Sequence, residues 1–358
     1  MVSRPRVRQL LLIAALLLLP VVHARSPEDP VFQESFLFQG TELIPECYKP
    51  TLLCLPDGIL ACAWATGSGS RALDTTIKLS FKPPDSNNWS PPVSIPNDIG
   101  YPDNYPILAQ FPGGRLRLVY ATLYPDERKA KPGTESASWH LKFRDSTDGG
   151  RVWGGDFFLT PEADRIPSGR VTQLANGDLL LPITDVRRKA TLFLLSEQQG
   201  NYWKDTAPIP RSEQIMDVAI AELNPGHLLA VLRPYDLGEQ DRFMWKSESL
   251  DNGRTWSQSE ATGSPNPYSS IDLLKLSNGH LVLAYSNNKE WPTPLALSIS
   301  LDGGKTWPHR RNLVLEQWDN RDPVLAQTSD GLIHAVYVYR DSSIRHVLLN
   351  EAWIMGKK

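Results

Sequence analysis

The chain has 358 residues and a formal net charge of −3, with 22% charged and 41% hydrophobic residues. Because charges of both signs are interspersed along it, we expect neither nucleic acid nor an anionic membrane to be its main partner. It contains no zinc signature, P-loop or Gly-x-Ser-x-Gly motif, and no run of closely spaced acids resembles an oxygen-ligand loop. We therefore expect no bound metal and no cofactor.

The first 24 residues have the layout of a secretory signal peptide. Three arginines precede an apolar run over residues 10–22, and Val22-His23-Ala24 is an acceptable cleavage site. The apolar run is short for a bilayer span, although an uncleaved N-terminal anchor is the alternative. Removing residues 1–24 takes away three arginines and no acid, so the net charge changes from −3 to −6. The sequence predicts a periplasmic or secreted monomer with one domain over residues 25–358 and no membrane contact after cleavage.

Cysteines are few and close together, at Cys47, Cys54 and Cys62. In an exported protein, one disulfide among them would leave one thiol over. The alternative is that each is a small buried apolar residue. The sequence leaves this choice open.

Six short apolar stretches each reach a tight glycine turn and continue as an alternating apolar stretch, which is typical of β-hairpins. The hairpins recur about every fifty residues, a period typical of repeat architectures. Units of four short strands repeated six times predict an all-β, six-bladed β-propeller. We expect residues 31–39 to close the ring as a strand of the last blade. The turn glycines are Gly58, Gly114, Gly177, Gly226, Gly279 and Gly331.

An octet recurs after the third strand of several units. It reads SLDNGRTW at 249–256, SLDGGKTW at 300–307 and STDGGRVW at 146–153, with a degenerate copy, SEQQGNYW, at 196–203. The aspartate can accept backbone N–H bonds within a turn, and glycine supplies the positive φ that the turn needs. We therefore expect the octet to stabilise the fold and to carry no catalytic residue.

The octet resembles the Asp-box of the sialidase superfamily, and the six units are similar to those of bacterial BNR-repeat sialidase-like proteins. This resemblance implies an active site on the face opposite the Asp-boxes, where the innermost strands begin. It also implies a tyrosine nucleophile paired with a glutamate, an aspartate acid/base, and three arginines that bind the carboxylate of a sialic acid.

Three residues match parts of that pattern. Asp74 lies in the first-blade loop that carries the acid/base aspartate. Asp217 opens the inner strand of the fourth blade, in the place of the glutamate. Arg233 follows the fourth-blade hairpin, in the place of one carboxylate-binding arginine.

Other positions depart from the pattern. Tyr48 and Lys49, which we expect to bind the substrate, stand where the first arginine would be, and the fifth blade lacks the third arginine. The tyrosine position reads Arg321-Asp322. An anion site rebuilt from other blades would use Arg170, Arg188 and Arg321.

We therefore expect an exo-acting glycoside hydrolase for a terminal sugar of a glycan, an acidic sugar included, in which Asp74, Asp217 and Asp322 converge. Asp322 would act as nucleophile or base, and Asp74 or Asp217 as acid. The alternative is a non-catalytic glycan-binding propeller. Its aromatic platforms would be Tyr105, Tyr235 and Trp291, and Tyr339-Arg340-Asp341 either belongs to the site or caps a hairpin.

Overall fold

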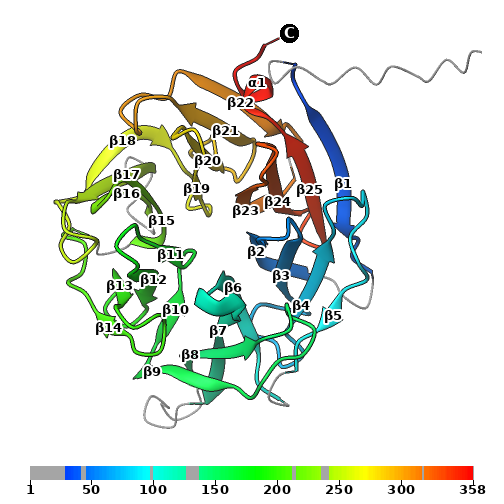
Figure 1. Cartoon of the computed structure of the whole chain (residues 1–358), viewed down its shortest axis with the longest axis vertical. Coiled ribbons are helices and arrows are strands. Elements are labelled where there is room, and N and C mark those ends of the chain that lie inside the picture. The colour runs from blue at the N-terminus through cyan, green and yellow to red at the C-terminus, as the bar shows by residue number, and fades with distance from the viewer. Residues whose placement is uncertain are drawn as a thin grey trace, which may run out of the picture.

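A computed structural model of the chain shows six antiparallel sheets arranged as a ring around a central axis (Figure 1). The predicted six-bladed β-propeller is therefore confirmed. Residues 1–24, the expected signal peptide, lie outside the described part of the chain. In the described part, no helix is long and apolar enough to cross a membrane. The structure describes residues 29–41, 46–96, 100–125, 137–211, 215–234, 242–316 and 318–357.

Each blade is numbered along the chain, and its strands run from the axis outward. Blade 1 contains β2 (Glu46–Cys54), β3 (Leu60–Gly67), β4 (Thr76–Lys82) and β5 (Val93–Ser94); blade 2 contains β6 (Asp103–Gln110), β7 (Leu116–Pro125), β8 (Ala137–Ser146) and β9 (Phe157–Ala163). Blade 3 contains β10 (Arg165–Pro167) and β11 (Thr172–Gln173), then β12 (Leu179–Asp185), β13 (Ala190–Ser196) and β14 (Lys204–Asp205).

Blade 4 contains β15 (Ile215–Asn224), β16 (His227–Pro234), β17 (Phe243–Ser249) and β18 (Glu260–Pro265). Blade 5 contains β19 (Asp272–Lys275), β20 (Leu281–Ser286), β21 (Leu295–Ser300) and β22 (His309–Val314), and blade 6 contains β23 (Asn320–Gln327), β24 (Ile333–Tyr339), β25 (Ser343–Leu349) and β1 (Phe32–Phe38). Two short helical segments complete the elements, η1 (Pro112–Gly114) and α1 (Glu351–Ile354).

The ring closes as the sequence predicts, because β1 from the N-terminal segment is the outermost strand of the last blade. It pairs antiparallel with β25, from Phe32 opposite Leu349 to Phe36 opposite Arg345. Asn350 adds a second link: its Oδ1 accepts from the backbone N–H groups of Val31 and Trp353, each at 3.0 Å. The N-terminal strand is thus tied to both the sheet and the start of α1.

The core consists of apolar layers between neighbouring blades. Every residue of β3, β12, β20 and β24 is buried, because each of these strands is covered on both faces. Between blades 3 and 4, Leu180 and Phe193 pack against Val218 and Leu228. The continuous apolar runs in the hairpins therefore reflect burial on two sides.

The Asp-box stabilises the turn from inside and fastens one blade to the one before it. Asp251 Oδ1 accepts from Ser249 Oγ and from the Thr255 backbone N–H, each at 2.8 Å. Gly253 has a φ of 77°, and a Cβ there would lie 2.4 Å from a methyl carbon of Leu180 in the preceding blade. Trp256 stacks on Phe193 of that blade, with ring centroids 4.8 Å apart. These contacts bear out the expected structural role.

Cysteine pairing is also settled for the described residues, where all three cysteines are free thiols. Cys47 and Cys62 are completely buried, and Cys54 is half-buried. Burial raises the pKa of the Cys47 thiol to about 12, so it stays protonated at neutral pH. The structure therefore agrees with the second alternative, in which the cysteines are small apolar residues of the interior and form no disulfide.

Candidate active site

Three side chains reach the axis from the same structural position in blades 1, 2 and 6. Lys49, Tyr105 and Asp322 each directly precede a proline, and the pairing of β2, β6 and β23 is interrupted around them. Their φ angles are 45°, 58° and 55°. This left-handed conformation is unfavourable for residues other than glycine, by about 1–3 kcal/mol each. Because such strain clusters at functional sites, three repeats of it around one axis indicate a site.

These bulges surround a cavity of about 210 Å³ at the centre of the ring. Its wall contains apolar side chains of the inner strands, such as Leu52 and Leu108. The ionisable groups of its wall come from all six blades and gather on the face where the inner strands begin. They are Lys49, Tyr105, Arg170, Asp217, Asp272 and Asp322.

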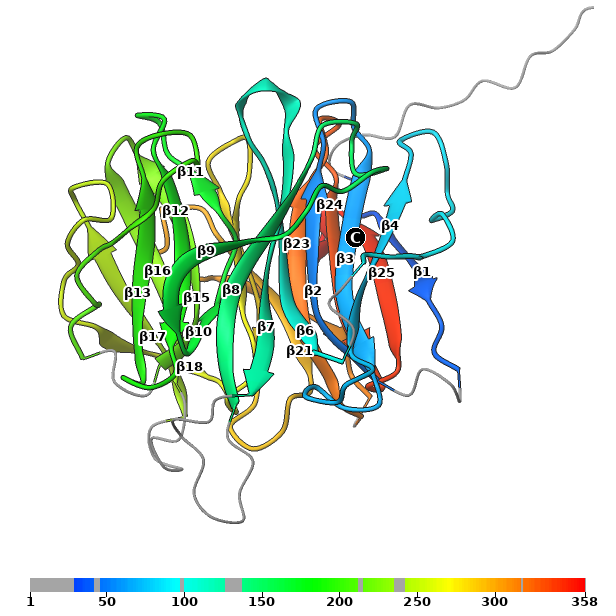
Figure 2. The ribbon, with the colours of Figure 1, turned by 90° about the horizontal axis from the view of Figure 1, so that it is seen from below.

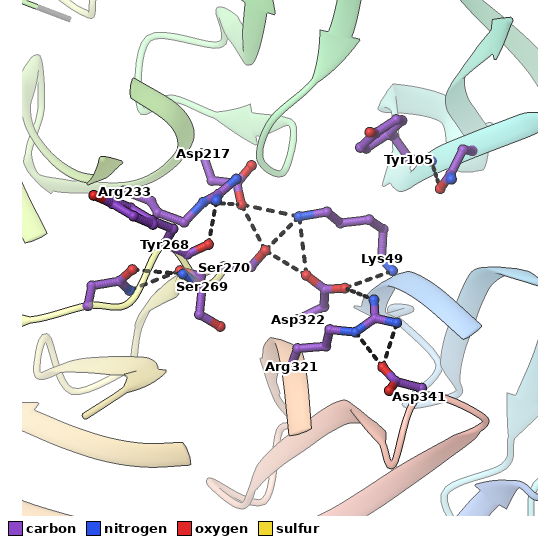
Figure 3. Close-up of polar contacts among 12 residues, drawn as sticks. Lys49, Tyr105, Asp217, Arg233, Tyr268, Ser269, Ser270, Arg321, Asp322 and Asp341 are labelled. Atoms are coloured by element: carbon purple, nitrogen blue, oxygen red, sulfur yellow. Dashed lines mark hydrogen bonds and ion pairs between the residues drawn. The ribbon is translucent and has the colours of Figure 1, made fainter. Parts of the chain in front are cut away.

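Lys49 lies between two carboxylates that come from two other blades (Figure 3). Its Nζ is 3.2 Å from Asp217 Oδ2 in blade 4 and 3.2 Å from Asp322 Oδ1 in blade 6. Ser270, just before β19, accepts from the same ammonium, with its Oγ at 2.6 Å. The Ser270 hydroxyl is also within hydrogen-bonding distance of both carboxylates, at 2.8 Å from Asp217 and 2.6 Å from Asp322. One cation and one hydroxyl therefore hold the two acids together.

The shared hydroxyl limits the distance between the acids. Because Ser270 Oγ lies 2.8 Å from Asp217 Oδ2 and 2.6 Å from Asp322 Oδ1, these two oxygens are no farther apart than the carboxyl groups of retaining glycosidases, about 5–5.5 Å. The facing oxygens of the two acids therefore lie closer together than the roughly 6.5–9.5 Å that separates the carboxyl groups of inverting glycosidases.

The two carboxylates differ in how many partners they have. Asp322 uses both oxygens, since Oδ2 accepts from the Lys49 backbone N–H at 3.3 Å and lies 3.4 Å from Arg321 Nη1. All partners of Asp217 bind Oδ2: Lys49, Ser270 and Arg233, whose Nε lies 2.9 Å away. In the described part of the chain, Asp217 Oδ1 has no hydrogen-bond partner. Asp217 thus presents one oxygen that has no partner among the described residues.

Electrostatics keep both acids ionised. Burial opposes the charge of Asp217, but Arg233, Lys49 and Ser270 outweigh it, so the pKa of Asp217 is lowered. The pKa of Asp322 is lowered as well, because Lys49 and Arg321 overcome the same effect of burial. Burial also opposes the charge of Lys49, yet the two carboxylates raise its pKa overall. At neutral pH neither acid carries a proton, and the ammonium is charged.

Further polar contacts orient the side chains of this cluster. Arg233 Nη1 donates to the Tyr268 carbonyl at 2.6 Å, which fixes the guanidinium beside Asp217. Arg321 Nη2 lies 2.8 Å from Asp341, and the guanidinium stacks 5.2 Å from the ring centroid of Tyr48. Tyr48, predicted to bind substrate, is buried beneath Arg321 and does not line the cavity.

Arg170 enters the cavity where the inner strand of blade 3 breaks between β10 and β11. Its Nη2 pairs with Asp272 and donates to the Leu325 carbonyl at 2.9 Å. At the break, a Cβ on Gly169 would lie 2.2 Å from the Val218 carbonyl of blade 4. The glycine permits this close approach, and the next residue then points inward. Arg170 is therefore in the cavity, as predicted, but already bound to an internal carboxylate.

Asp74 and Arg188 neither line the cavity nor contact the cluster, whereas Arg233 and Arg321 do not line it but pair with its acids. Asp74 is exposed in the loop between β3 and β4, where it accepts from the Ser68 backbone N–H at 3.1 Å and hydroxyl at 2.8 Å. The Arg188 side chain is 59% exposed in the turn after β12 and lies 3.6 Å from Asp185. Tyr235 is outside the described residues. Hence Asp217 and Asp322 come together, and Asp74 does not join them.

Sequence reasoning missed two residues that organise the site, Ser270 and Asp272, and left the role of a third, Asp341, open. Ser270 and Asp272 stand in the stretch SSIDL that opens the fifth inner strand, where the family pattern names no functional group. Both alternatives suggested for Tyr339-Arg340-Asp341 apply to Asp341. It lies in a hairpin turn with a φ of 60°, and its carboxylate binds Arg321 of the site. Position along the chain was the signal that could have identified these residues, because each lies at that end of its blade which faces the site.

The BNR repeat-like domain family matches residues 58–335 of the chain. The chain belongs to this family. A sialidase from Bacteroides fragilis (strain YCH46) is 26% identical over 197 residues, which cover 49% of this chain and 35% of that protein. The chain thus matches only about a third of that sialidase.

Solved structures share the fold at low identity. The Hadza microbial sialidase Hz136 has a TM-score of 0.76 at 17% identity, covering 90% of this chain and 69% of that chain. An α-L-arabinanase from Penicillium chrysogenum, complexed with arabinobiose, has a TM-score of 0.67 at 15% identity. The match covers 90% of this chain and 98% of the arabinanase chain. A protein of unknown function from Dyadobacter fermentans has a TM-score of 0.74 at 18% identity, and the match covers 89% of this chain and 99% of that chain. The resemblance to the sialidase superfamily is confirmed as a sialidase-like propeller with glycoside hydrolases among its relatives.

Proposed function

We propose that the protein is an exo-acting glycoside hydrolase that removes a terminal sugar from a glycan. The observation that carries this proposal is the close pair of ionised carboxylates, Asp217 and Asp322, in the central cavity. Glycosidases use two carboxylates near one anomeric centre. A cavity enclosed by six inner strands fits the end of a glycan, whereas an open groove would be needed for the middle of one.

Within this proposal, Asp217 is the carboxylate that reacts. Its Oδ1 lacks a partner among the described residues, whereas both oxygens of Asp322 are occupied. Asp322 then serves mainly to hold Lys49 and Ser270, which in turn fix Asp217. This reverses the roles expected from the sequence, where Asp322 takes the place of the nucleophile. The acid role of Asp74 stays a prediction.

The charge balance favours a neutral sugar over an acidic one. Three cations of the cluster, Lys49, Arg233 and Arg321, face three carboxylates, Asp217, Asp322 and Asp341. A sugar carboxylate would have to compete with these internal acids for each cation. A neutral sugar meets no such competition.

The second candidate is a glycan-binding propeller without turnover. Two observations favour it: neither carboxylate of the pair carries a proton at neutral pH, and the indole of Trp291 is 65% exposed. Trp291 lies in the loop between β20 and β21, on the face where the inner strands begin. An exposed indole on this face suits stacking against a sugar ring.

Hydrolysis of a panel of fluorogenic glycosides, neutral sugars and a sialoside included, distinguishes the two candidates. We expect turnover of at least one neutral glycoside, its loss in Asp217→Asn, and a smaller loss in Asp322→Asn. Asp302→Asn, in the Asp-box of blade 5, is the matched control. Turnover of the sialoside alone would contradict the preference for a neutral sugar. Glycan binding without any turnover would support the second candidate.

We also propose that the protein is exported. The support is the arrangement of three arginines, an apolar run and a small-residue cleavage site in residues 1–24. Expression of the full chain with a C-terminal tag, followed by N-terminal sequencing of the extracytoplasmic protein, tests this. A mature chain that begins at Arg25 is expected, and an intact Met1 in the cytoplasm would contradict export.

A further inference from the structure

Tyr105 is placed like Lys49 and Asp322 but has no role in their hydrogen-bonded cluster. All three precede a proline in a bulge of an inner strand, with left-handed φ angles. Lys49 and Asp322 bind each other, whereas among the described residues the Tyr105 hydroxyl forms no hydrogen bond. Figure 3 shows the ring apart from the cluster, with no dashed line at its hydroxyl. The strain at Tyr105 is therefore unexplained by any contact of its hydroxyl.

The backbone and ring of Tyr105 are nevertheless held firmly. Its N–H donates to the side chain of Asn104 at 2.7 Å, and Asn104 Nδ2 donates to the Ser70 carbonyl at 3.1 Å. The ring edge packs against Trp139, with centroids 5.3 Å apart and an interplanar angle of 86°. A fixed ring with a free hydroxyl is what a group that meets a ligand requires.

The hydroxyl lies in the field of the site. Tyr105 lines the cavity with Lys49 and Asp217. It interacts electrostatically with these two groups, with Asp322, and with Arg71 in the loop between β3 and β4. Two cations and two carboxylates therefore contribute to the electrostatic field at the hydroxyl. A proton donor is also the one element that the ionised carboxylate pair lacks.

We propose that Tyr105 is the proton donor of the hydrolysis, with Asp217 as its nucleophilic partner. The inference rests on the proposed function and deepens it. The bond between the anomeric carbon and the leaving oxygen breaks, its electron pair goes to that oxygen, and the Tyr105 proton goes with it. A bond forms at the same time between Asp217 Oδ1 and the anomeric carbon. Water then bonds to this carbon, the carboxylate leaves, and the water proton returns to the Tyr105 phenolate.

The surroundings suit both states of the phenol. Burial raises the pKa of Tyr105, with Lys49 opposing the rise, so the group is protonated and able to donate at neutral pH. Lys49 and Arg71 stabilise the phenolate that forms when the proton leaves. Such preorganised charge at the place where charge develops is a main source of catalysis.

The test compares leaving groups in Tyr105→Phe and in the matched control Tyr101→Phe. Tyr101 packs against Tyr124 in the same blade and does not line the cavity. For a phenyl glycoside of a sugar that the wild type accepts, we expect kcat/KM of Tyr105→Phe to fall by about 100-fold or more. For a 2,4-dinitrophenyl glycoside, the leaving group departs as a phenolate and needs no proton. The kcat/KM of Tyr105→Phe on this substrate should therefore fall by less than about tenfold. Tyr101→Phe should match the wild type on both.

A second variant guards against simple misfolding. Tyr105→His keeps a proton donor and a residue type that tolerates a left-handed φ. We expect it to recover part of the phenyl glycoside rate, with a pH optimum displaced toward the imidazole range. Equal losses on both substrates, or leaving-group dependence in Asp74→Asn in place of Tyr105→Phe, would overturn the proposal. A wild type that cleaves no glycoside would refute the proposed function itself, and this inference with it.

Discussion

Lys49 binds Asp322 twice across the junction between the first and last blades. Its ammonium lies 3.2 Å from Oδ1, and its backbone N–H donates to Oδ2 at 3.3 Å. A second link lies at the rim, where β1, the strand before blade 1 in the chain, belongs to the last blade and lies beside β25 (Figure 2). The junction is therefore fastened at its inner and outer ends, and the inner fastening is part of the candidate active site.

Lys49→Met should raise the pKa of both Asp217 and Asp322, because it removes a cation that favours their ionised forms. A carboxyl group with a lowered folded-state pKa stabilises the fold above its unfolded pKa, and this contribution disappears as the pH falls. We expect the free energy of unfolding at pH 7 to fall by about 1–3 kcal/mol. The acid limb of the rate profile should move to higher pH. Denaturant titrations and pH–rate curves measure the two effects.

Lys78→Met is the control for this variant, because Lys78 binds Ser94 at the outer part of blade 1. It should change neither the rate profile nor the unfolding free energy by more than about 0.5 kcal/mol. If Lys49→Met and Lys78→Met behave alike, Lys49 does not set the charge state of the site.

Arg170→Leu should destabilise the protein by leaving the buried carboxylate of Asp272 without its cation. Removal of one partner from a buried pair costs about 3 kcal/mol. Asp272 also accepts from the Leu325 backbone N–H at 2.7 Å, so it cannot simply turn to solvent. The double variant Arg170→Leu/Asp272→Leu should recover much of the loss. Chemical denaturation of the two variants gives the comparison, and a double variant less stable than Arg170→Leu would contradict it.

Asp251→Ala tests the separation between fold and chemistry. The variant loses the hydrogen bonds from Ser249 and Thr255, so the free energy of unfolding should drop by about 1–2 kcal/mol. Because the Asp-box lies at the opposite end of the blade from the inner-strand starts, kcat/KM at 25 °C should stay unchanged. A folded Asp251→Ala protein with strongly reduced turnover would show that the box contributes to the site.

Two buried histidines should make the last blade sensitive to acid. His334 Nδ1 and His346 Nε2 lie 2.9 Å apart in β24 and β25, with the rings stacked. Burial lowers the pKa of His334 to about 4 and that of His346 to about 3. Between pH 6.5 and these values the unfolded chain binds more protons than the folded one, so stability falls as the pH falls.

We expect a loss of about 2–4 kcal/mol between pH 7 and pH 5 from the pair. Lys82 opposes the charge of both rings, whereas Asp330 favours that of His334. Replacing both histidines by leucine should flatten this part of the stability curve, measured by denaturant titration at several pH values. An unchanged slope in the double variant would assign the acid sensitivity to other groups.

The sequence was sufficient for the fold because the information there is local and repeated. Each Gly turn and each Asp-box reports on its own hairpin, and six repeats predict the ring, including its closure by residues 31–39. The site is different, since its residues come from blades far apart in the chain. Asp217 and Arg233 could be placed together because they pair within one hairpin, opposite each other in β15 and β16.

Contacts between blades were beyond sequence reasoning. Nothing local indicates that Lys49 lies between Asp217 and Asp322, or that Ser270 binds both acids. The sequence did place Asp74 correctly in a loop on the functional face, but its side chain binds Ser68 within that loop. Its position along the chain gave no information about the direction in which the side chain points.

Chemical rescue of Asp217→Ala by azide tests the central claim most directly. If Asp217 is the reacting carboxylate of a glycosidase, its removal abolishes turnover of a 2,4-dinitrophenyl glycoside that the wild type accepts. Azide, a small anionic nucleophile, should then restore turnover and yield a glycosyl azide. The same treatment of Asp322→Ala should yield none. Rescue of Asp322→Ala alone would contradict the assignment and return the nucleophile to blade 6.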